Sequence, residues 1–206
     1  MDKFLNLSIE WKDGKFFYHP SISKIKMKNI INEGKDNLIE SISPDENDII
    51  LDLTAGLCSE ALLIANFCKK VVALEDSFPT YLVVSEGLKK YEYKEKWMKG
   101  ASEKISLINK NYKNYLKDVK SESFDVVYCD PMFENPQMKS SALNPMRRFA
   151  CYDQVTHEDL NEMLRVSKKR VVIKARSTDS LWERIKFEKI TGSLKSGVLF
   201  GVIDKK

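Results

Sequence analysis

The sequence predicts an α/β fold, a doubly wound and mostly parallel sheet of seven strands, and three observations indicate it. Five near-continuous apolar runs have the length of strands, at 48–53, 70–75, 105–108, 124–129 and 170–174. Each is followed by a segment with helical periodicity, at 59–68, 78–91, 112–119, 156–166 and 180–186, and Thr156 is the expected N-cap of the fourth. Runs that are apolar throughout are typical of parallel strands covered by helices on both faces. The alternation of strand and helix favours a doubly wound sheet over a bundle or a sandwich.

Two hairpins complete the predicted architecture. At the carboxyl end, apolar segments at 187–191 and 198–203 flank a turn near Gly197, which predicts a terminal antiparallel hairpin. At the amino end, segments 7–11 and 16–18 flank an Asp-Gly pair, whose glycine tolerates the positive φ of a tight turn.

A helix is expected next, over 22–31, where Lys24, Lys26 and Lys28 alternate with apolar residues. A basic helix and an ordinary solvated helix face are both compatible with this pattern, and the solvated face is the favoured interpretation. We therefore expect a small appendage of hairpin and helix over residues 1–35, and the main domain over 36–206.

Composition bounds the class of protein. A chain of 206 residues supports one well-buried core, and 43% hydrophobic with 31% charged residues is typical of globular proteins. The longest apolar runs, such as 61–68, are much shorter than the roughly 20 residues that span a bilayer, so we expect a cytoplasmic protein. The net charge of +4 permits a nucleic-acid partner without requiring one. Oligomeric state is not predicted.

Cysteine and histidine usage argues against metal and disulfide chemistry. The four cysteines form no CxxC pair, and three lie in or beside apolar segments, so buried free thiols are expected, at Cys58, Cys68, Cys129 and Cys151. Only two histidines are present, with no cluster of His, Cys and carboxylate residues, so no metal site is predicted.

The turn after the first strand of the main domain predicts a ligand site. In an open parallel sheet, ligands bind beyond the carboxyl ends of the strands, where the strand order reverses. Here Gly56 allows the backbone to approach a ligand closely, and Asp52 places a carboxylate beside it. Glu75 ends the second strand, 23 residues after Asp52, where a carboxylate can accept hydrogen bonds from ribose hydroxyls. This arrangement fits an adenosine ligand.

Charge selects among adenosine ligands. A dinucleotide fingerprint has the form GxGxxG, whereas this chain has Gly56-Leu57-Cys58-Ser59-Glu60-Ala61, and a negative Glu60 would repel a pyrophosphate. S-adenosylmethionine has no phosphate and carries a positive sulfonium, so acidic residues around the turn attract it. We therefore prefer S-adenosylmethionine over a dinucleotide.

The segment Asp130-Pro131-Met132-Phe133, directly after the fourth strand, predicts a clamp for an aromatic amine. The proline holds Asp130 extended, and the Asp130 carboxylate and the Pro131 carbonyl offer two acceptors to the hydrogens of an exocyclic amine. Phe133 can stack on the base, whereas Met132 is expected to serve packing. Taken alone the tetrapeptide is compatible with a plain turn, and its place after a parallel strand beside a cofactor turn favours the clamp.

These motifs resemble a known family. The runs Asp52-Leu53-Thr54-Ala55-Gly56-Leu57, 72–75, 130–133 with 139–143, and 169–174 are similar to class I S-adenosylmethionine-dependent methyltransferases of the ribosomal small subunit methyltransferase J type, in a shorter bacterial branch. The resemblance implies a Rossmann-like fold and methylation of guanosine N2 in small-subunit rRNA. It also places Asn111 at the adenine, a position where Asn is equally a routine helix N-cap. Cys58 departs from the family pattern of a second glycine, which puts a thiol near the expected cofactor path.

From these observations we expect cofactor contacts from one set of residues, namely Asp52, Thr54, Gly56, Glu75, Asp76, Asn111 and Asp130. The catalytic set is Asp130, Pro131 and Phe133. Residues 134–155 carry few strand or helix signals, as substrate loops often do. We interpret four cations as candidate RNA phosphate contacts, with a solvated surface role equally open for each, namely Lys139, Arg147, Arg148 and Lys174.

The predicted function is transfer of a methyl group from S-adenosylmethionine to an exocyclic base amine, with guanine N2 of rRNA favoured. Two other readings remain open. The acceptor could be a small amine or a protein side chain, or the domain could bind RNA or a partner without turnover.

Overall fold

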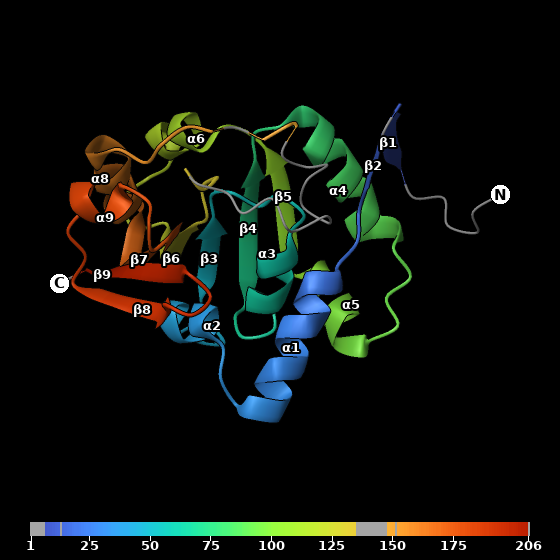
Figure 1. The fold of residues 1–206 in the computed structure, drawn as a ribbon, viewed down its shortest axis with the longest axis horizontal. Coiled ribbons are helices and arrows are strands. Elements are labelled where there is room, and N and C mark those ends of the chain that lie inside the picture. The colour runs from blue at the N-terminus through green and yellow to red at the C-terminus, as the bar shows by residue number, and fades with distance from the viewer. Residues whose placement is uncertain (1–6, 13, 135–147, 151, 206) are drawn as a thin grey trace.

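The computed structural model describes residues 7–12, 14–134, 148–150 and 152–205, and it has a twisted seven-stranded sheet at its centre (Figure 1). The strand order is β5-β4-β3-β6-β7-β9-β8, with β3–β7 mutually parallel and β9 antiparallel to both β7 and β8. The strands are β3 (Ile49–Asp52), β4 (Lys70–Glu75), β5 (Ile105–Asn109), β6 (Phe124–Cys129), β7 (Ser167–Arg176), β8 (Lys189–Ser193) and β9 (Val198–Asp204). The predicted fold class and the terminal hairpin are confirmed.

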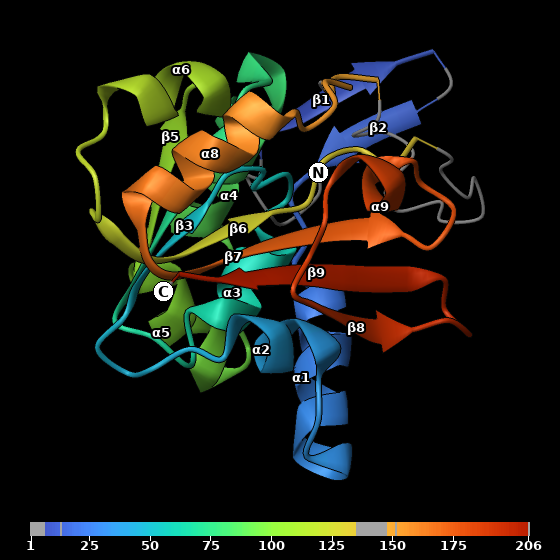
Figure 2. The ribbon, with the colours of Figure 1, turned by 90° about the vertical axis from the view of Figure 1, so that its left-hand side faces the viewer.

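Helices cover both faces of the sheet (Figure 2). One face carries α1 (Ser21–Glu33), α2 (Asn37–Ile42), α3 (Ser59–Ile64), α4 (Phe78–Lys90) and α5 (Lys96–Glu103). The other carries α6 (Tyr112–Asp118), α8 (His157–Val166) and α9 (Leu181–Arg184). None of these helices is long and apolar enough to cross a membrane, within the residues described.

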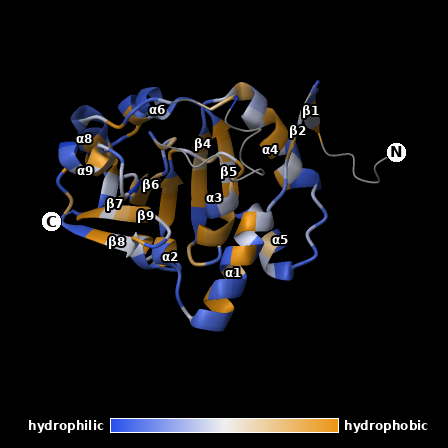
Figure 3. Cartoon of the chain, in the orientation of Figure 1, coloured by the Kyte–Doolittle hydropathy of each residue, from blue (hydrophilic) through white to orange (hydrophobic). Residues whose placement is uncertain are grey.

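The strands are continuously apolar because successive side chains enter two different cores. In β6, Val126 and Tyr128 pack with the helices of the first face, whereas Val127 and Cys129 pack with those of the second. Figure 3 shows the result, since the central strands are coloured hydrophobic and the outer helix surfaces are largely hydrophilic. A doubly covered sheet is what the sequence pattern predicts.

Helix starts follow their capping residues. Thr156 caps α8 with its hydroxyl accepting from the Asp159 amide, while Asp159 accepts in return from the Thr156 amide. The predicted N-cap at Thr156 is therefore confirmed. Asn111 also caps, since its Oδ1 accepts from the Lys113 amide at 3.0 Å at the start of α6.

Several boundaries differ from the sequence prediction. The helices α2 and α5 were not predicted, although Asp36 caps α2 by accepting from two backbone amides. Strand β8 begins at Lys189, two residues later than expected, and α3 ends at Ile64 rather than residue 68. Short elements such as α2 carry too few turns for periodicity to identify them.

The N-terminal segment forms a hairpin and a helix, as predicted. Strands β1 (Ser8–Trp11) and β2 (Gly14–Phe17) pair antiparallel as a separate two-stranded sheet. The segment is attached to the main body by Tyr18, which is 1% exposed, lies against Gly87 of α4 and hydrogen-bonds Tyr93. A Cβ on Gly87 would lie 2.2 Å from the Tyr18 ring, so glycine permits this close packing. The division at residue 35 remains a prediction.

Candidate functional site

A cavity of about 450 Å³ lies at the carboxyl ends of the parallel strands. The strand order reverses there, because β4 lies on one side of β3 and β6 on the other. Such a switch point is where open α/β sheets bind ligands, and the volume is in the usual range of small-molecule pockets. Predicted residues from five segments line it, namely Asp52, Thr54, Gly56, Glu75, Asp76, Asn111, Asp130, Pro131, Phe133 and Lys174.

The turn between β3 and α3 is organised by Glu75 at the end of β4. Its Oε2 accepts from the Gly56 amide at 2.9 Å, and its Oε1 accepts from the Ser77 amide at 2.8 Å. Gly56 has φ 50°, a left-handed conformation that glycine adopts without strain. Because a carboxylate oxygen has two lone pairs, Glu75 can hold the turn and still accept hydrogen bonds from a ligand.

Burial dominates the electrostatics of the two strand-end carboxyls. Asp52 is 1% exposed, and desolvation raises its pKa to about 8 although the Thr54 amide donates to it. Desolvation likewise raises the pKa of Glu75 to about 7, against the lowering effect of the Ser77 and Gly56 amides. Two carboxyls whose ionisation burial disfavours are stabilised as anions by a cationic ligand.

Asn111, the predicted adenine contact, is hydrogen-bonded to Asp76. Asn111 donates from Nδ2 to Oδ2 of Asp76 at 3.0 Å, while its Oδ1 serves as the N-cap of α6. Both residues line the cavity, and Asp76 is exposed at its edge. The N-cap role of Asn111 and its predicted adenine contact are therefore compatible, because the residue that caps α6 also lies in the cavity wall.

Asp130 follows directly on β6 and is held from two sides. Its amide donates to Thr54 Oγ1 at 2.6 Å, which ties it to the turn after β3. Its Oδ2 accepts from Lys174 Nζ at 2.6 Å, and among the described residues its Oδ1 has no hydrogen bond. One carboxylate oxygen of Asp130 is thus available on a residue that lines the cavity.

Phe133 lies three residues further on and also lines the cavity. Two cations approach its ring, with Lys174 Nζ and Arg176 Cζ each 5.7 Å from the centroid. Met132 packs against the first hydrophobic core, as expected.

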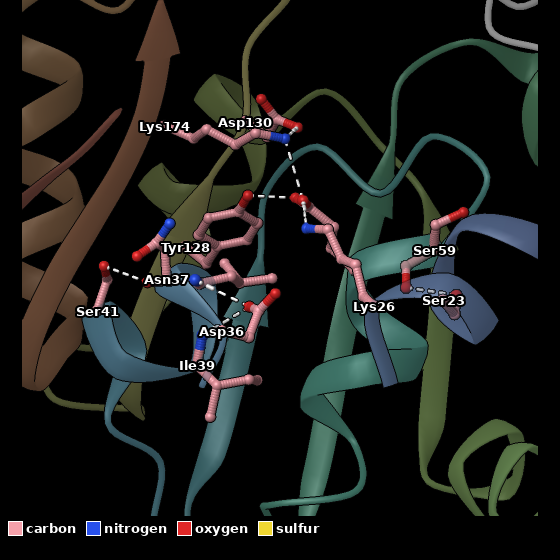
Figure 4. Close-up of polar contacts among 12 residues, drawn as sticks. Ser23, Lys26, Asp36, Asn37, Ile39, Ser41, Ser59, Tyr128, Asp130 and Lys174 are labelled. Carbon is pink, nitrogen blue, oxygen red and sulfur yellow. Dashed lines mark hydrogen bonds and ion pairs between the residues drawn. The ribbon is translucent and has the colours of Figure 1, made fainter. Parts of the chain in front are cut away.

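A buried ion-pair network connects Asp130 to the N-terminal helix (Figure 4). Lys174 donates to both Asp130 and Glu60, at 2.6 and 3.0 Å. Glu60 Oε1 also accepts from Lys26 of α1 at 2.6 Å, and its Oε2 accepts from the Tyr128 hydroxyl. The side chains of Lys174 and Glu60 are each only 14% exposed. We call the four charged residues Lys26, Glu60, Lys174 and Asp130 the ion-pair chain.

The neighbours of each residue in the ion-pair chain determine the direction in which its pKa is shifted. Desolvation works to raise the pKa of Glu60, but Lys174 and Lys26 outweigh it and hold the pKa below its ordinary value. Desolvation raises the pKa of Asp130 to about 6, with Lys174 opposing and Glu60 reinforcing the rise. Burial works to lower the pKa of Lys174, but Asp130 and Glu60 overcome it and raise the pKa, so Lys174 stays charged.

This network changes two sequence interpretations. Glu60 is neutralised by two lysines, so it is not the free negative charge that the argument against a pyrophosphate assumed. The acidic character of the cavity comes instead from Asp52, Glu75 and Asp76. Lys174 was interpreted as a phosphate contact, but its ammonium is already bonded to two carboxylates, which does not favour that role.

Cys58 lies at the N-terminus of α3 with φ 55°, a conformation that favours glycine. Its side chain is 0% exposed and belongs to the first hydrophobic core, whereas Gly56, Leu57 and Ser59 line the cavity. The thiol therefore points into the core, and the concern that it would obstruct a cofactor is not supported. Cys68 and Cys129 are free and buried as expected, while Cys151 lies outside the described residues.

The predicted phosphate contacts Lys139 and Arg147 lie outside the described residues. Arg148 is exposed, and its guanidinium lies 5.2 Å from the centre of the Trp11 ring. This contact places Arg148 of the predicted substrate loop next to the N-terminal hairpin.

Two cavity residues that the sequence reasoning missed carry buried hydroxyls. Thr80 Oγ1 and Ser59 Oγ have no hydrogen-bond partner within the described part of the chain, and both residues line the cavity. Unsatisfied buried hydroxyls are costly unless a ligand meets them. Together with the acidic wall, they fit a polar, cationic ligand such as S-adenosylmethionine. The described residues include no group of histidine, cysteine and carboxylate side chains able to hold a metal ion.

Comparisons with known proteins agree with this geometry. A family model described as "Putative SAM-dependent methyltransferase" matches residues 9–191. The uncharacterized protein YpiP of Bacillus subtilis is 32% identical over 178 residues, covering 84% of this chain and 67% of that protein. The ribosomal RNA small subunit methyltransferase J of Coxiella burnetii (strain Dugway 5J108-111) is 38% identical over 130 residues, covering 61% of this chain and 49% of its own length. The chain therefore spans about half the length of the named rRNA enzyme.

Solved structures show the same fold. The crystal structure of the SAM-dependent methyltransferase NGO1261 from Neisseria gonorrhoeae superposes with a TM-score of 0.64 at 17% identity, covering 95% of this chain and 77% of that chain. At that identity the likeness establishes the Rossmann-like methyltransferase fold. With the match over residues 9–191, it follows that this chain belongs to the family of S-adenosylmethionine-dependent methyltransferases and uses S-adenosylmethionine as its cofactor.

Proposed function

We propose that the chain methylates an exocyclic amine of a nucleic-acid base, with guanine N2 in small-subunit ribosomal RNA as the favoured acceptor. The observation that carries the proposal is that Asp130 Oδ1 has no hydrogen-bond partner among the described residues, while Thr54 and Lys174 hold this cavity-lining residue in place. The names of the relatives that act on small-subunit rRNA support the choice of acceptor.

The chemistry needs alignment more than acid or base catalysis. When bound, S-adenosylmethionine would supply an electrophilic methyl group, whose bond to sulfur breaks as the bond to nitrogen forms, so that S-adenosylhomocysteine leaves and the methylated amine releases a proton to water. An aromatic amine delocalises its lone pair into the ring, and acceptors for both amine hydrogens favour a pyramidal nitrogen whose lone pair can reach the methyl. Asp130 Oδ1 and the Pro131 carbonyl serve as these acceptors, and the Asp130 carboxylate stabilises the positive charge that develops on nitrogen.

Phe133 holds the base by stacking, an interaction worth about 1 to 3 kcal/mol per base. Its place in the cavity wall and its contacts with Lys174 and Arg176 support this role. Because contacts with two cations help to hold the ring in position, the base would meet a preorganised surface.

Each predicted cofactor contact that lines the cavity is assigned to one part of the cofactor. Glu75 accepts from the ribose, Asp76 and Asn111 lie at the adenine, and the turn formed by Asp52, Thr54 and Gly56 faces the charged end of the molecule. Asp130 borders both ligands, because it lies between the turn and Phe133.

RNA is the proposed partner, in the cytoplasm where ribosomes are assembled. Lys139, Arg147 and Arg148 are proposed to contact phosphates, while Lys174 supports Asp130 instead. Arg148 lies on the Trp11 ring, so the N-terminal hairpin is proposed to border the RNA. Binding to rRNA fragments should weaken steeply with added salt, because each phosphate contact releases counterions. A salt-independent interaction would favour a small acceptor.

A comparison of modified nucleosides tests the function directly. Ribosomal RNA and tRNA from cells with and without the gene are digested and analysed by mass spectrometry. Loss of N2-methylguanosine from small-subunit rRNA is expected, and its return on expression of the intact protein but not of Asp130→Asn would link the loss to the site. If every nucleoside is unchanged, the acceptor is a small amine or a protein side chain, or the domain does not turn over.

A further inference from the structure

We propose that Lys26 of the N-terminal helix is a positioning residue of the active site, which acts through Glu60 and Lys174 to hold the Asp130 carboxylate. The inference rests on the proposed role of Asp130. It makes α1 part of the catalytic machinery rather than an appendage beside it.

The ion-pair chain alternates in sign from α1 to β6. Glu60 Oε1 accepts from Lys26 at 2.6 Å and from Lys174 at 3.0 Å, and Lys174 in turn donates to Asp130 at 2.6 Å. Glu60 and Asp130 therefore compete for one ammonium. Lys26 relieves the competition, because it supplies Glu60 with a second cation and leaves Lys174 closer to Asp130 than to Glu60.

Helix α1 is held in the position that the contact between Lys26 and Glu60 requires. Ser23, one turn before Lys26, donates to the backbone carbonyl of Ser59 at 2.6 Å and is 0% exposed. Met27 is 8% exposed and belongs to the first hydrophobic core. The Lys26 side chain is only 25% exposed, whereas Lys28 on the same helix is exposed. Lys26 thus lies on the buried face of α1, beside the N-terminus of α3.

The surroundings of Asp130 make its charge sensitive to the other members of the ion-pair chain. Charged or titratable groups from five elements act on or near it, namely Lys26 of α1, Asp52 of β3, Glu60 of α3, Tyr128 and Cys129 of β6, and Lys174 of β7. Of these described groups, only Lys26 and Lys174 are cations. Removing Lys26 leaves one ammonium for two buried carboxylates, so Lys174 should move toward Glu60 and Asp130 should lose part of its ion pair with Lys174.

The test compares Lys26→Met with Lys28→Met in the full-length protein. Methionine keeps the length of the lysine stem without its charge, and Lys28 is an exposed lysine on the same helix. The ionisation of Asp130 is followed by carbon NMR of aspartate-labelled protein, with its signal assigned by its loss in Asp130→Asn. An upward shift of the Asp130 pKa is expected in Lys26→Met, none in Lys28→Met, and partial restoration in Lys26→Arg. An unchanged Asp130 titration in Lys26→Met overturns the proposal.

Folding and function are separated by two further measurements. Thermal unfolding and S-adenosylmethionine affinity by calorimetry show whether Lys26→Met is folded and loaded. If it fails to fold, Glu60→Gln is measured instead, since it removes the competing charge and should shift the Asp130 pKa downward. Once an acceptor is available, the acidic limb of the kcat profile should move with the Asp130 pKa. A shift in titration without methyl transfer to any RNA would retain the ion-pair chain and reject the proposed function.

Discussion

Glu75 and Asp130 are both carboxylates at the carboxyl ends of parallel strands, both line the cavity, and they are held by different means. Glu75 accepts two backbone amides, from Gly56 and Ser77. Asp130 is held by side chains, Thr54 on its amide and Lys174 on its carboxylate. The proposed cofactor side of the site is thus fixed by backbone geometry. The proposed acceptor side depends on a network that reaches α1, and it should respond to substitutions far from the cavity.

The largest effect is expected on the acceptor side. Asp130→Asn keeps the size of the side chain but removes the anion that stabilises charge on the nitrogen, so methyl transfer should fall by about 100-fold or more. Cofactor affinity measured by calorimetry should change little. The exposed Asp118→Asn provides the matched control. Activity retained in Asp130→Asn would remove the clamp from the mechanism.

The cofactor side should show the opposite pattern. Glu75→Gln loses charged hydrogen bonds to the ribose and weakens the Gly56 turn, so S-adenosylmethionine should bind about tenfold more weakly. With saturating cofactor, kcat should stay close to that of the natural protein. The surface variant Glu86→Gln on α4 controls for loss of a carboxylate. If the affinity measured by calorimetry is unchanged, the ribose lies elsewhere.

A fall in pH should weaken cofactor binding but stabilise the folded protein. Burial raises the pKa of Asp52 to about 8 and that of Glu75 to about 7, so both anions are lost as pH falls through this window. Affinity for the cationic cofactor should therefore increase between pH 6 and 8, roughly the span of the two raised values. Calorimetric titrations at several pH values measure this.

The sign for stability follows from proton uptake. The folded state keeps these protons to higher pH than the unfolded chain, so the two groups favour folding at low pH and lose that contribution as pH rises toward their raised pKa values. Thermal unfolding without cofactor, measured at several pH values, should show this loss of stability as pH rises. Asp52→Asn should reduce the slope of stability against pH. Stability that rises with pH across this window would contradict the assignment.

The smallest effect is expected at Thr80. Thr80→Val removes a buried hydroxyl that has no partner among the described residues, so the free protein should be equally or more stable. If the hydroxyl bonds the cofactor, binding should weaken by a few-fold, about 1 kcal/mol. Comparing thermal unfolding and calorimetry for Thr80→Val and the exposed Thr178→Val separates the two effects. Unchanged affinity would remove Thr80 from the cofactor site.

Much of the fold could be predicted because its elements have local signals. The apolar runs predicted every strand of the sheet, and Thr156 predicted the start of α8. The two short helices α2 and α5 were missed because few turns give little periodicity. Predicted cofactor and catalytic residues within the described chain all line one cavity, since strand ends in a parallel sheet meet at one edge. Their roles in binding and catalysis remain predictions.

By itself the sequence determined the strand-helix order, and with it the edge where Asp52, Glu75 and Asp130 gather. Only the tertiary structure decided which charges are free. Lys26, Glu60 and Lys174 looked like surface or ligand-facing charges, and the fold brings them together with Asp130 in one chain of ion pairs. Likewise, the direction of the Cys58 thiol depends on a left-handed backbone conformation at the turn. Periodicity reports burial of whole segments, whereas the ion-pair chain joins residues up to 114 positions apart.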